Sequence, residues 1–404
     1  MSGSDYTKPS IRAAEPDTTR ILRSLRLTLD GTPVPDIGGS GLGYQNILYV
    51  ATVLAHLTKV AEEDCPLLIV EEPEAHLHPQ LVILLADSLA EVEPGRGTPQ
   101  TIVTTHSPTF AAHVEPEQLR VMTADSAGLG TVKSIAEAGL DKKEARAVKR
   151  MMDVTRSALY FAKAAILVEG ISEALLIPAL ARKLGFDLAR EHVSVLPICG
   201  VAFGTLAKLL DEKALGAPVA IITDGDPSVV YADKDKDWKT AKPKEVAGAF
   251  EVCDRLKKLR EDFKDHSNVK IFPSSVTLEY DLANGGDANA PLMAKVWETI
   301  FKRKPGTLKE SMIDATAQRS DKALVVWRGI CLANTTGSKA DFAHRLAAAL
   351  EGDEDIDMSN FEVPTYIQKA VEFVIERTAP GASAGGGSES AAEPAPPSGD
   401  EADG

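Results

Sequence analysis

The sequence predicts an α/β protein that contains two parallel β-sheets. Residues 66–72 (PLLIVEE) and 100–108 (QTIVTTHSP) are short apolar runs typical of buried strands, and residues 73–92 between them have apolar side chains at helical spacing. The same alternation returns in KAAILVEG (163–170), VSVLPICG (193–200) and APVAIITDGD (217–226). Strands that alternate with helices favour parallel sheets, because each helix carries the chain back across the sheet.

The other elements are expected in chain order. They are a flexible leader (1–20), a strand within 21–31, a helix over 44–63, a helix over 171–185 that ends at Gly185, an exposed, partly helical insertion (231–265), a strand over 269–282, and helices to about residue 350. Residues 378–404 are rich in Gly, Ala, Ser and Pro, a composition typical of a disordered tail.

The net charge of −15 argues against a broadly basic surface for nucleic acid. The acidic excess is concentrated, since residues 351–362 and the chain after Arg377 together hold eleven acidic residues and no basic ones. Basic clusters at 142–150, 255–260 and 301–309 are either solvated helix faces or contacts for DNA phosphates. The total charge therefore weakens a DNA-binding hypothesis, whereas its distribution is compatible with one.

Nothing in the sequence points to a membrane or to an oxidising compartment. No apolar run approaches the roughly 20 residues that span a bilayer, and the first 20 residues lack the apolar core of a signal peptide. The four cysteines are scattered without a CxxC pair, which favours neither a zinc site nor a disulfide framework. We therefore expect a cytoplasmic protein with no membrane contact.

Residues 38–46 (GGSGLGYQN) form a glycine-rich turn directly before a helical stretch. Backbone N–H groups and the dipole at the start of a helix attract phosphate. The turn nevertheless lacks the Gly-Lys-Ser/Thr ending of a P-loop. It is either part of a nucleotide site or a simple helix-capping turn.

Polar side chains follow both strands of the first predicted sheet. Glu71 and Glu72 come directly after four apolar residues, and His106 follows the next strand. In P-loop-type ATPases an acid at this position coordinates Mg²⁺ and a neighbouring group orients the attacking water. Open α/β sheets also bind ligands at the carboxyl ends of their strands. The alternative is that the acids begin a loop and His106 caps a turn; the order of the features favours an ATPase.

Together these motifs resemble the signature loop, the Walker B strand with its D-loop, and the switch histidine of ABC-type ATPases. The subtype is the one found in DNA-repair ATPases and in the OLD (overcoming lysogenization defect) family. The resemblance implies a set of nucleotide-site residues: Ser40, Gly41, Gly43 and His106 as contacts to ATP, Glu71 as the Mg²⁺ ligand, and Glu72 as the catalytic carboxylate.

The sequence departs from this family in one large respect, because the Walker A motif GxxxxGK[ST] occurs nowhere in the 404 residues. Three explanations are open: the chain is a fragment, a separate chain supplies the missing lobe, or ATPase function is lost. Each of them argues against ATP turnover by this chain alone.

A second group of acids follows the strands of the second predicted sheet. Glu169 ends one strand and Glu173 lies one helical turn further on, so both carboxylates can face one site. Asp224 and Asp226 follow another strand, and residues at i and i+2 of an extended segment point to the same side. Such oxygen ligands suit Mg²⁺ or Mn²⁺, and two ions can promote phosphodiester cleavage. The alternative is a pair of ordinary acidic loop starts.

The segment LVEGISE followed later by Asp-x-Asp resembles the Toprim fold of topoisomerases, primases and certain nucleases. Two further segments, SSVTLEYDL and GSKADFA, resemble those of OLD-family nucleases. The resemblance implies that Glu279, expected after a strand, is a third acidic ligand and that Lys339 stabilises the charged transition state. Asp281 is a weaker ligand candidate and Ser275 a polar support. Otherwise Lys339 is an exposed residue in the first turn of a helix.

The combined resemblance predicts the C-terminal part of an ABC-type ATPase sheet followed by a Toprim (Rossmann-like) domain with a helical insertion. The expected segments are a flexible leader (1–20), a partial ATPase domain (21–135), a helical connector (136–162), a Toprim nuclease domain (163–350), an acidic stretch with a terminal helix (351–377) and a disordered tail (378–404).

The implied activity is a metal-dependent DNA endonuclease. Two Mg²⁺ or Mn²⁺ ions are held by Glu169, Glu173, Asp224, Asp226 and Glu279, and ATP is a further ligand only if Walker A is supplied. The implied partners are DNA and either a second copy of the chain or a chain that carries the missing lobe. One alternative is a non-catalytic or regulatory DNA-associated remnant. Another alternative is nucleotidyl transfer, as in topoisomerases or primases. Two absences argue against it: the sequence has no evident segment with a strand-joining tyrosine and no zinc module.

Overall fold

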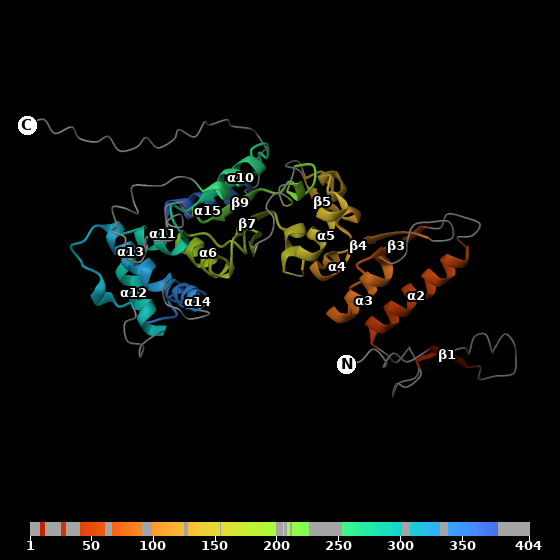
Figure 1. Ribbon diagram of the computed structural model, residues 1–404. Helices are drawn as coiled ribbons and strands as arrows, with labels where there is room; N and C mark the ends of the chain where they lie inside the picture. Colours follow the sequence, from red (N-terminus) through yellow and green to blue (C-terminus); the bar gives the residue numbers. More distant parts are fainter. Residues whose placement is uncertain are drawn as a thin grey trace, which may run out of the picture.

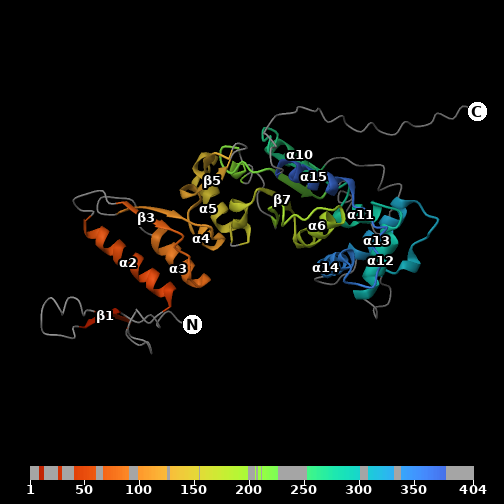
Figure 2. The ribbon, with the colours of Figure 1, turned by 180° about the vertical axis from the view of Figure 1, so that it is seen from behind.

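A computed structural model describes residues 9–12, 26–29, 41–60, 67–90, 99–124, 128–153, 155–198, 205, 208–210, 212–225, 253–300, 308–331 and 338–378. Two groups of elements lie at opposite ends of the molecule in both views (Figure 1, Figure 2). The orange elements α2, β3 and α3 form one end, the green and blue elements the other, and yellow elements connect them. The mixed α/β class predicted from the sequence is confirmed by the parallel sheets described next.

The first group is built around two parallel strands, β3 (Leu67–Glu71) and β4 (Gln100–Thr104). Alternate residues of β3 are buried, and Leu68 and Val70 share a core with Val82 and Leu85 of helix α3 (Pro79–Ala90). Helix α2 (Leu42–Val60) contributes Val50 to this core. An antiparallel pair, β1 (Pro9–Arg12) and β2 (Arg26–Leu29), precedes it. Helix α3 begins later than predicted, because residues 73–76 form turns.

The connecting segment carries a β-hairpin that was not predicted. Strands β5 (Arg120–Ala124) and β6 (Gly130–Ser134) pair antiparallel. The elements around them are α4 (Pro108–His113), the 3₁₀ helices η2 (Pro116–Gln118), η3 (Ile135–Ala138) and η4 (Arg156–Phe161), and α5 (Lys142–Met151). The buried hydroxyl of Ser157 in η4 donates a 2.8 Å hydrogen bond to the carbonyl of Pro108, which ties η4 to α4.

The second sheet has four parallel strands in the order β10-β9-β7-β8. They are β7 (Ala164–Val168), β8 (Val193–Pro197), β9 (Val219–Thr223) and β10 (Val269–Pro273). Every residue of β7 and β9 is buried, as expected for strands covered on both faces. Helix α6 (Ile171–Lys183) follows β7, and Gly185 beyond it has a φ of 92°, which agrees with the predicted helix end.

Helices from the last part of the chain complete this core. They are α10 (Asp254–Asp262), α11 (Leu278–Asn284), α12 (Asn289–Ile300), the 3₁₀ helix η5 (Glu310–Met312), α13 (Arg319–Cys331), α14 (Ser338–Glu351) and α15 (Thr365–Thr378). Helix α14 packs on α6, and α15 packs on β7, β9 and β10. The fully buried Val371 and Val374 of α15 share a core with Ile166 of β7.

The prediction of a strand over 269–282 is wrong beyond Pro273. Residues 278–284 form helix α11 instead, and Thr277 caps it by accepting a hydrogen bond from the N–H of Tyr280. The carboxylate of Asp281 also accepts N–H groups of Ser275 and Val276 at 2.9 and 3.0 Å. These local hydrogen bonds satisfy the backbone in a turn, so the strand cannot continue. Glu279 therefore lies on a helix and not directly after a strand.

Several predictions fall outside the described residues: Ser40, Asp226, most of the leader and of the 231–265 insertion, and the tail after Thr378. Within the described part of the chain, no helix is both long and apolar enough to cross a bilayer.

Candidate functional site

The carboxyl ends of β7 and β9 bring Glu169 and Asp224 together. One oxygen of Glu169, Oε1, accepts hydrogen bonds from the N–H of Asp224 at 2.8 Å and from the hydroxyl of Thr223. The strands are neighbours in the sheet, with Leu167 opposite Ile221, so their following residues meet at one edge. The structure therefore places these two strand-end acids side by side.

Asp224 in turn contacts the start of helix α11. Its Oδ1 accepts the N–H of Leu278 at 2.9 Å, and the hydroxyl of Ser274 lies 3.5 Å away. The neighbouring Gly225 fits tightly, since a Cβ atom there would lie 2.5 Å from the carbonyl oxygen of Ser274. The carboxylate thus holds the first turn of α11, and with it Glu279, at the end of the sheet.

Glu279 and Lys339 form an ion pair at this edge. Lys339 Nζ lies 2.9 Å from Glu279 Oε1, and the Glu279 side chain is 8% exposed whereas that of Lys339 is 52% exposed. The acid is supplied by α11 and the cation by the first turn of α14. A lysine that is half open to solvent beside a buried acid is well placed to meet an approaching anion.

Glu173, on the first turn of α6, belongs to the same cluster of charges. Burial raises the pKa of its carboxyl, and the negative charges of Glu279 and Glu169 raise it further. Its Oε2 accepts the N–H of Gly170 at 3.1 Å, which orients the side chain back toward the strand end. The structure therefore brings Glu169, Glu173, Asp224 and Glu279 to one end of the sheet.

The chemistry of this donor set suits a hard divalent cation, because its members are carboxylates that repel one another. The positions of these carboxylates do not form a complete metal site. Among the described residues, no three or more His, Cys, Asp or Glu side chains are arranged to hold an ion. Two of the four acids are paired with Arg255 and Lys339 instead, and Asp226 lies outside the described part. The set can therefore supply ligands, but only after these ion pairs rearrange.

Two side chains of the site have roles that the sequence did not indicate. Arg255, from the basic cluster at 255–260, contacts Glu169 Oε1 at 2.8 Å and the carbonyl of Asp224 at 2.9 Å. Asp281, predicted as a weaker ligand, instead braces the loop before α11 through Ser275 and Val276. Burial raises the pKa of Asp281, whereas the hydroxyl and N–H donors lower it. The hydroxyl of Ser275 donates a 2.7 Å hydrogen bond to Asp281.

A separate group of polar residues lies at the carboxyl ends of β3 and β4. His106 Nε2 lies 3.2 Å from Glu72 Oε1, so the predicted catalytic carboxylate and switch histidine meet. Glu72 has a φ of 44°, a left-handed conformation that is uncommon for residues other than glycine. Such strain is concentrated at functional sites. Glu71 is the last residue of β3 and pairs with Thr104.

Glu74 positions the histidine loop, although its role was not predicted. Its Oε1 accepts the hydroxyl of Thr105 and the N–H groups of His106 and Ser107, at 2.5, 3.0 and 3.1 Å. Its Oε2 is buried and has no hydrogen-bond partner among the described residues. The only sequence signal was its place two residues after Glu72.

Gly43, in the first turn of α2, lies against the loop that follows β3. A Cβ atom on Gly43 would lie 2.5 Å from the carbonyl oxygen of His76, so only glycine allows this approach. Gly41 begins the first turn of α2 by accepting the N–H of Tyr44 at 3.0 Å. A Cβ atom on Gly41 would meet nothing within 4 Å. The helix-capping interpretation therefore accounts for Gly41, and close packing accounts for Gly43.

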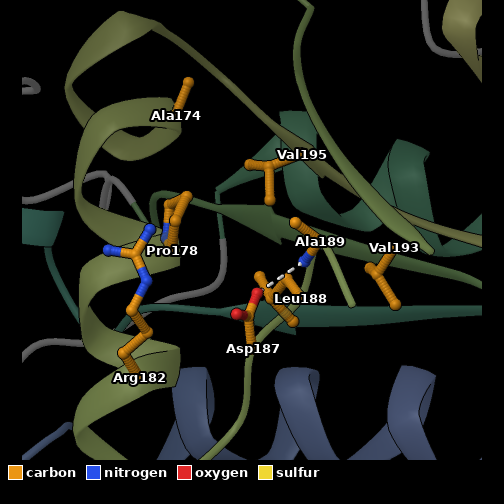
Figure 3. A pocket seen from close by; sticks show the side chains of 8 residues that line it. All are labelled: Ala174, Pro178, Arg182, Asp187, Leu188, Ala189, Val193 and Val195. Carbon is orange, nitrogen blue, oxygen red and sulfur yellow. Dashed lines mark hydrogen bonds between the residues drawn. The ribbon is translucent and has the colours of Figure 1, made fainter. Parts of the chain in front are cut away.

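A pocket lies between α6, the segment that follows it, and β8 (Figure 3). It is lined by Ala174, Pro178, Arg182, Asp187, Leu188, Ala189, Val193 and Val195. Two of these residues are joined by a hydrogen bond, in which Asp187 accepts the N–H of Ala189 at 3.1 Å. None of the predicted site residues lines this pocket.

Two segments of the chain match known domain families. Residues 25–111 match the family described as AAA ATPase domain, and residues 160–226 match the family described as overcoming lysogenization defect protein-like, TOPRIM domain. The first covers the glycine-rich turn, Glu71, Glu72 and His106. The second covers Glu169, Glu173, Asp224 and Asp226.

Full-length relatives are similar over part of their length. The chain is 26% identical over 302 residues to the OLD nuclease of Thermus scotoductus, covering 73% of this chain and 54% of that protein. It is 27% identical to the endonuclease GajA of Bacillus cereus, over 57% of this chain and 37% of that protein. It is also 27% identical to the Old nuclease of Escherichia phage P2, over 47% of this chain and 34% of that protein. The chain thus spans about half the length of the Thermus relative and about a third of the other two.

Among solved structures, the C-terminal region of the Xanthomonas campestris pv. campestris OLD protein is 23% identical, with a TM-score of 0.35, over 55% of this chain and 96% of that one. The C-terminal region of the Burkholderia pseudomallei OLD protein is 24% identical, with a TM-score of 0.32, over 54% and 100%. The family assignment depends on the sequence matches. The matched ATPase and TOPRIM segments, in this order, together with the nuclease relatives, support the assignment of the chain as an OLD family protein.

Proposed function

We propose that the chain is a TOPRIM endonuclease that hydrolyses DNA phosphodiester bonds with the help of divalent metal ions. The observation that carries the proposal is the meeting of Glu169, Asp224 and Glu279 at one end of the second sheet, beside Lys339. Relatives named OLD nuclease and endonuclease support the same activity. The proposed nuclease unit is residues 163–350, and the proposed location is the cytoplasm.

The proposed ligands for two Mg²⁺ or Mn²⁺ ions are Glu169, Glu173, Asp224, Asp226 and Glu279. When bound, such ions activate water and stabilise the leaving oxygen in phosphodiester cleavage. The protein groups do the remaining work. Gly170, Thr223 and the N–H of Leu278 orient the carboxylates through hydrogen bonds. Lys339, paired with Glu279 but half exposed, can turn to neutralise charge that develops on the phosphate.

The ATPase segment is proposed as a nucleotide-responsive element that works with a partner. The side chains of Glu72 and His106 lie 3.2 Å apart at the carboxyl ends of their strands, where open α/β sheets bind ligands. The lysine that would hold the phosphates is missing from the sequence. We therefore propose that ATP binds only where a second copy or another chain supplies a Walker A motif, and that this chain alone does not turn ATP over.

The test is nicking of supercoiled plasmid DNA with Mg²⁺ or Mn²⁺. Wild-type protein should nick the plasmid, and Asp224→Ala should reduce the rate at least 100-fold, because removing its carboxylate removes a ligand and frees α11. Asp353→Ala removes an exposed acid just beyond the C-terminal end of α14, the end opposite to Lys339; it serves as the control and should be as active as wild type. Equal nicking by Asp224→Ala and wild type would overturn the assignment.

A second variant separates catalysis from binding. Lys339→Ala should lower the single-turnover cleavage rate by about 100- to 1,000-fold, the usual cost of removing one transition-state charge contact. DNA affinity, measured by fluorescence anisotropy in Ca²⁺, should change little. Lys339→Arg should recover part of the rate. A loss confined to affinity would contradict a catalytic role for Lys339.

A further inference from the structure

Arg255, like Lys339, forms an ion pair with one of the strand-end acids. It lies in the first turn of α10, 86 residues from Glu169 in the sequence. One guanidinium nitrogen donates to Glu169 Oε1 at 2.8 Å and the other donates to the carbonyl of Asp224 at 2.9 Å. The planar fork of arginine can bridge two acceptors in this way, whereas the single ammonium of lysine cannot hold both as well.

Arg255 binds the Glu169 oxygen, Oε1, that also contacts the neighbouring strand β9. Oε1 accepts three donors: the hydroxyl of Thr223, the N–H of Asp224 and the guanidinium of Arg255. The first two belong to β9 and the residue after it, so they are fixed by the sheet. The Arg255 and Glu169 side chains are 39% and 27% exposed. An ion pair this open to solvent is weak, and Arg255 is the one donor that can leave.

We infer that Arg255 is a positioning residue that holds Glu169 in line with Asp224 and competes with a divalent cation for that carboxylate. The inference rests on the proposed function, because it requires Glu169 to bind the ion. Arg255 neutralises Glu169 and joins the ends of β7 and β9. A cation that binds Glu169 displaces the guanidinium, so the strength of the ion pair lowers the apparent affinity for the metal.

The test measures Mn²⁺ binding to the full chain by isothermal titration calorimetry, with no nucleic acid present. Arg255→Ala should bind Mn²⁺ about two- to five-fold more tightly than wild type, which corresponds to the strength of an exposed ion pair. Arg255→Lys keeps the charge without the bridge and should lie between the two. Arg260→Ala removes an exposed arginine from the far end of the same helix and should match wild type.

Thermal melts provide an independent measurement. In metal-free buffer Arg255→Ala should melt about 1–3 °C below wild type, because the strand-end acids lose a weak counter-charge. In saturating Mn²⁺ the difference should shrink, since the ion replaces the guanidinium in both proteins. A merely structural arginine would leave the difference unchanged in Mn²⁺.

The outcomes separate this inference from the proposed function. Glu169→Gln should bind Mn²⁺ at least ten-fold more weakly than wild type. If Glu169→Gln loses affinity while Arg255→Ala binds as wild type does, or more weakly, the role of Arg255 is overturned and the metal site stands. If neither wild type nor Arg255→Ala binds Mn²⁺, both the inference and the proposed metal site are overturned.

Discussion

Gly225 shows how a single backbone position shapes the candidate site. It follows Asp224, and its N–H donates to the hydroxyl of Ser274 at 3.1 Å. A Cβ atom added here would lie 2.5 Å from the carbonyl oxygen of Ser274 and 2.8 Å from that of Ser275. Both neighbours are backbone atoms, which cannot turn aside as a flexible side chain does. A larger residue must therefore push the two loops apart.

We expect Gly225→Ala to destabilise the protein by about 1–3 kcal/mol, the usual cost of overpacking. Cleavage should fall as well, because Asp224 would move away from Leu278. Urea unfolding and plasmid nicking measure the two effects. Gly130→Ala is the control, since a Cβ atom there meets nothing within 4 Å and stability should stay near wild type. Unchanged unfolding of Gly225→Ala would show that the loops can yield.

The site residues differ in how far the sequence could predict them. Glu169 and Asp224 were predictable because each directly follows a continuous apolar strand, and parallel strands end at the same edge. Arg255 was not, because it meets Glu169 only through tertiary packing across 86 residues. Glu74 was missed for a related reason: its partners are one hydroxyl and two backbone N–H groups, 31–33 residues further along. Motif reading detects strand ends, but not such long-range contacts.

At the scale of elements, the strands were predicted best. The apolar runs that became β7 and β9 are buried throughout, so hydrophobicity alone marks them. The end of β10 was harder, because residues 274–277 turn through hydrogen bonds to Asp224 and Asp281. The β5–β6 hairpin was missed too; its residues are mostly exposed and carry little apolar periodicity.

Helix α5 offers a test of pH dependence that is independent of the site. Asp141 caps it by accepting the N–H groups of Glu144 and Lys143 at 2.8 and 2.7 Å. The Glu144 side chain in turn accepts the N–H of Asp141, which completes a capping box. The hydrogen bond from the N–H of Glu144 is the main cause that lowers the pKa of Asp141 below 3.8. The folded state thus releases this proton more readily than the unfolded state.

Because the folded pKa is lowered, the stability that Asp141 contributes is present above its unfolded pKa of 3.8 and is lost as the pH falls through the folded value. We expect Asp141→Ala to melt below wild type at pH 6, because the cap is lost. The gap should narrow as the pH falls below 4. Thermal melts from pH 6 to pH 3 measure it. A gap that stays constant with pH would contradict the assigned charge.

At the scale of the whole molecule, one buried hydroxyl joins the ATPase segment to the connector. Ser157 Oγ donates to the Pro108 carbonyl. Ser157→Ala should leave that carbonyl with one fewer partner and cost about 1–3 kcal/mol. Hydrogen exchange should become faster in α4. Ser88→Ala, which removes an exposed hydroxyl bonded within α3, is the matched control and should leave exchange in α4 unchanged. Equal exchange in both variants would contradict a joining role.

The packing of α15 means that part of the second core can be completed only late in translation. The helix covers β7, β9 and β10, yet about a hundred residues separate it from the last of these strands. At roughly 5–20 residues per second, a ribosome needs about 5–20 seconds to translate that interval. During this delay the apolar side chains that α15 later buries have no native cover from it. The nascent chain should therefore be most vulnerable to aggregation, and most in need of a chaperone, just before α15 emerges.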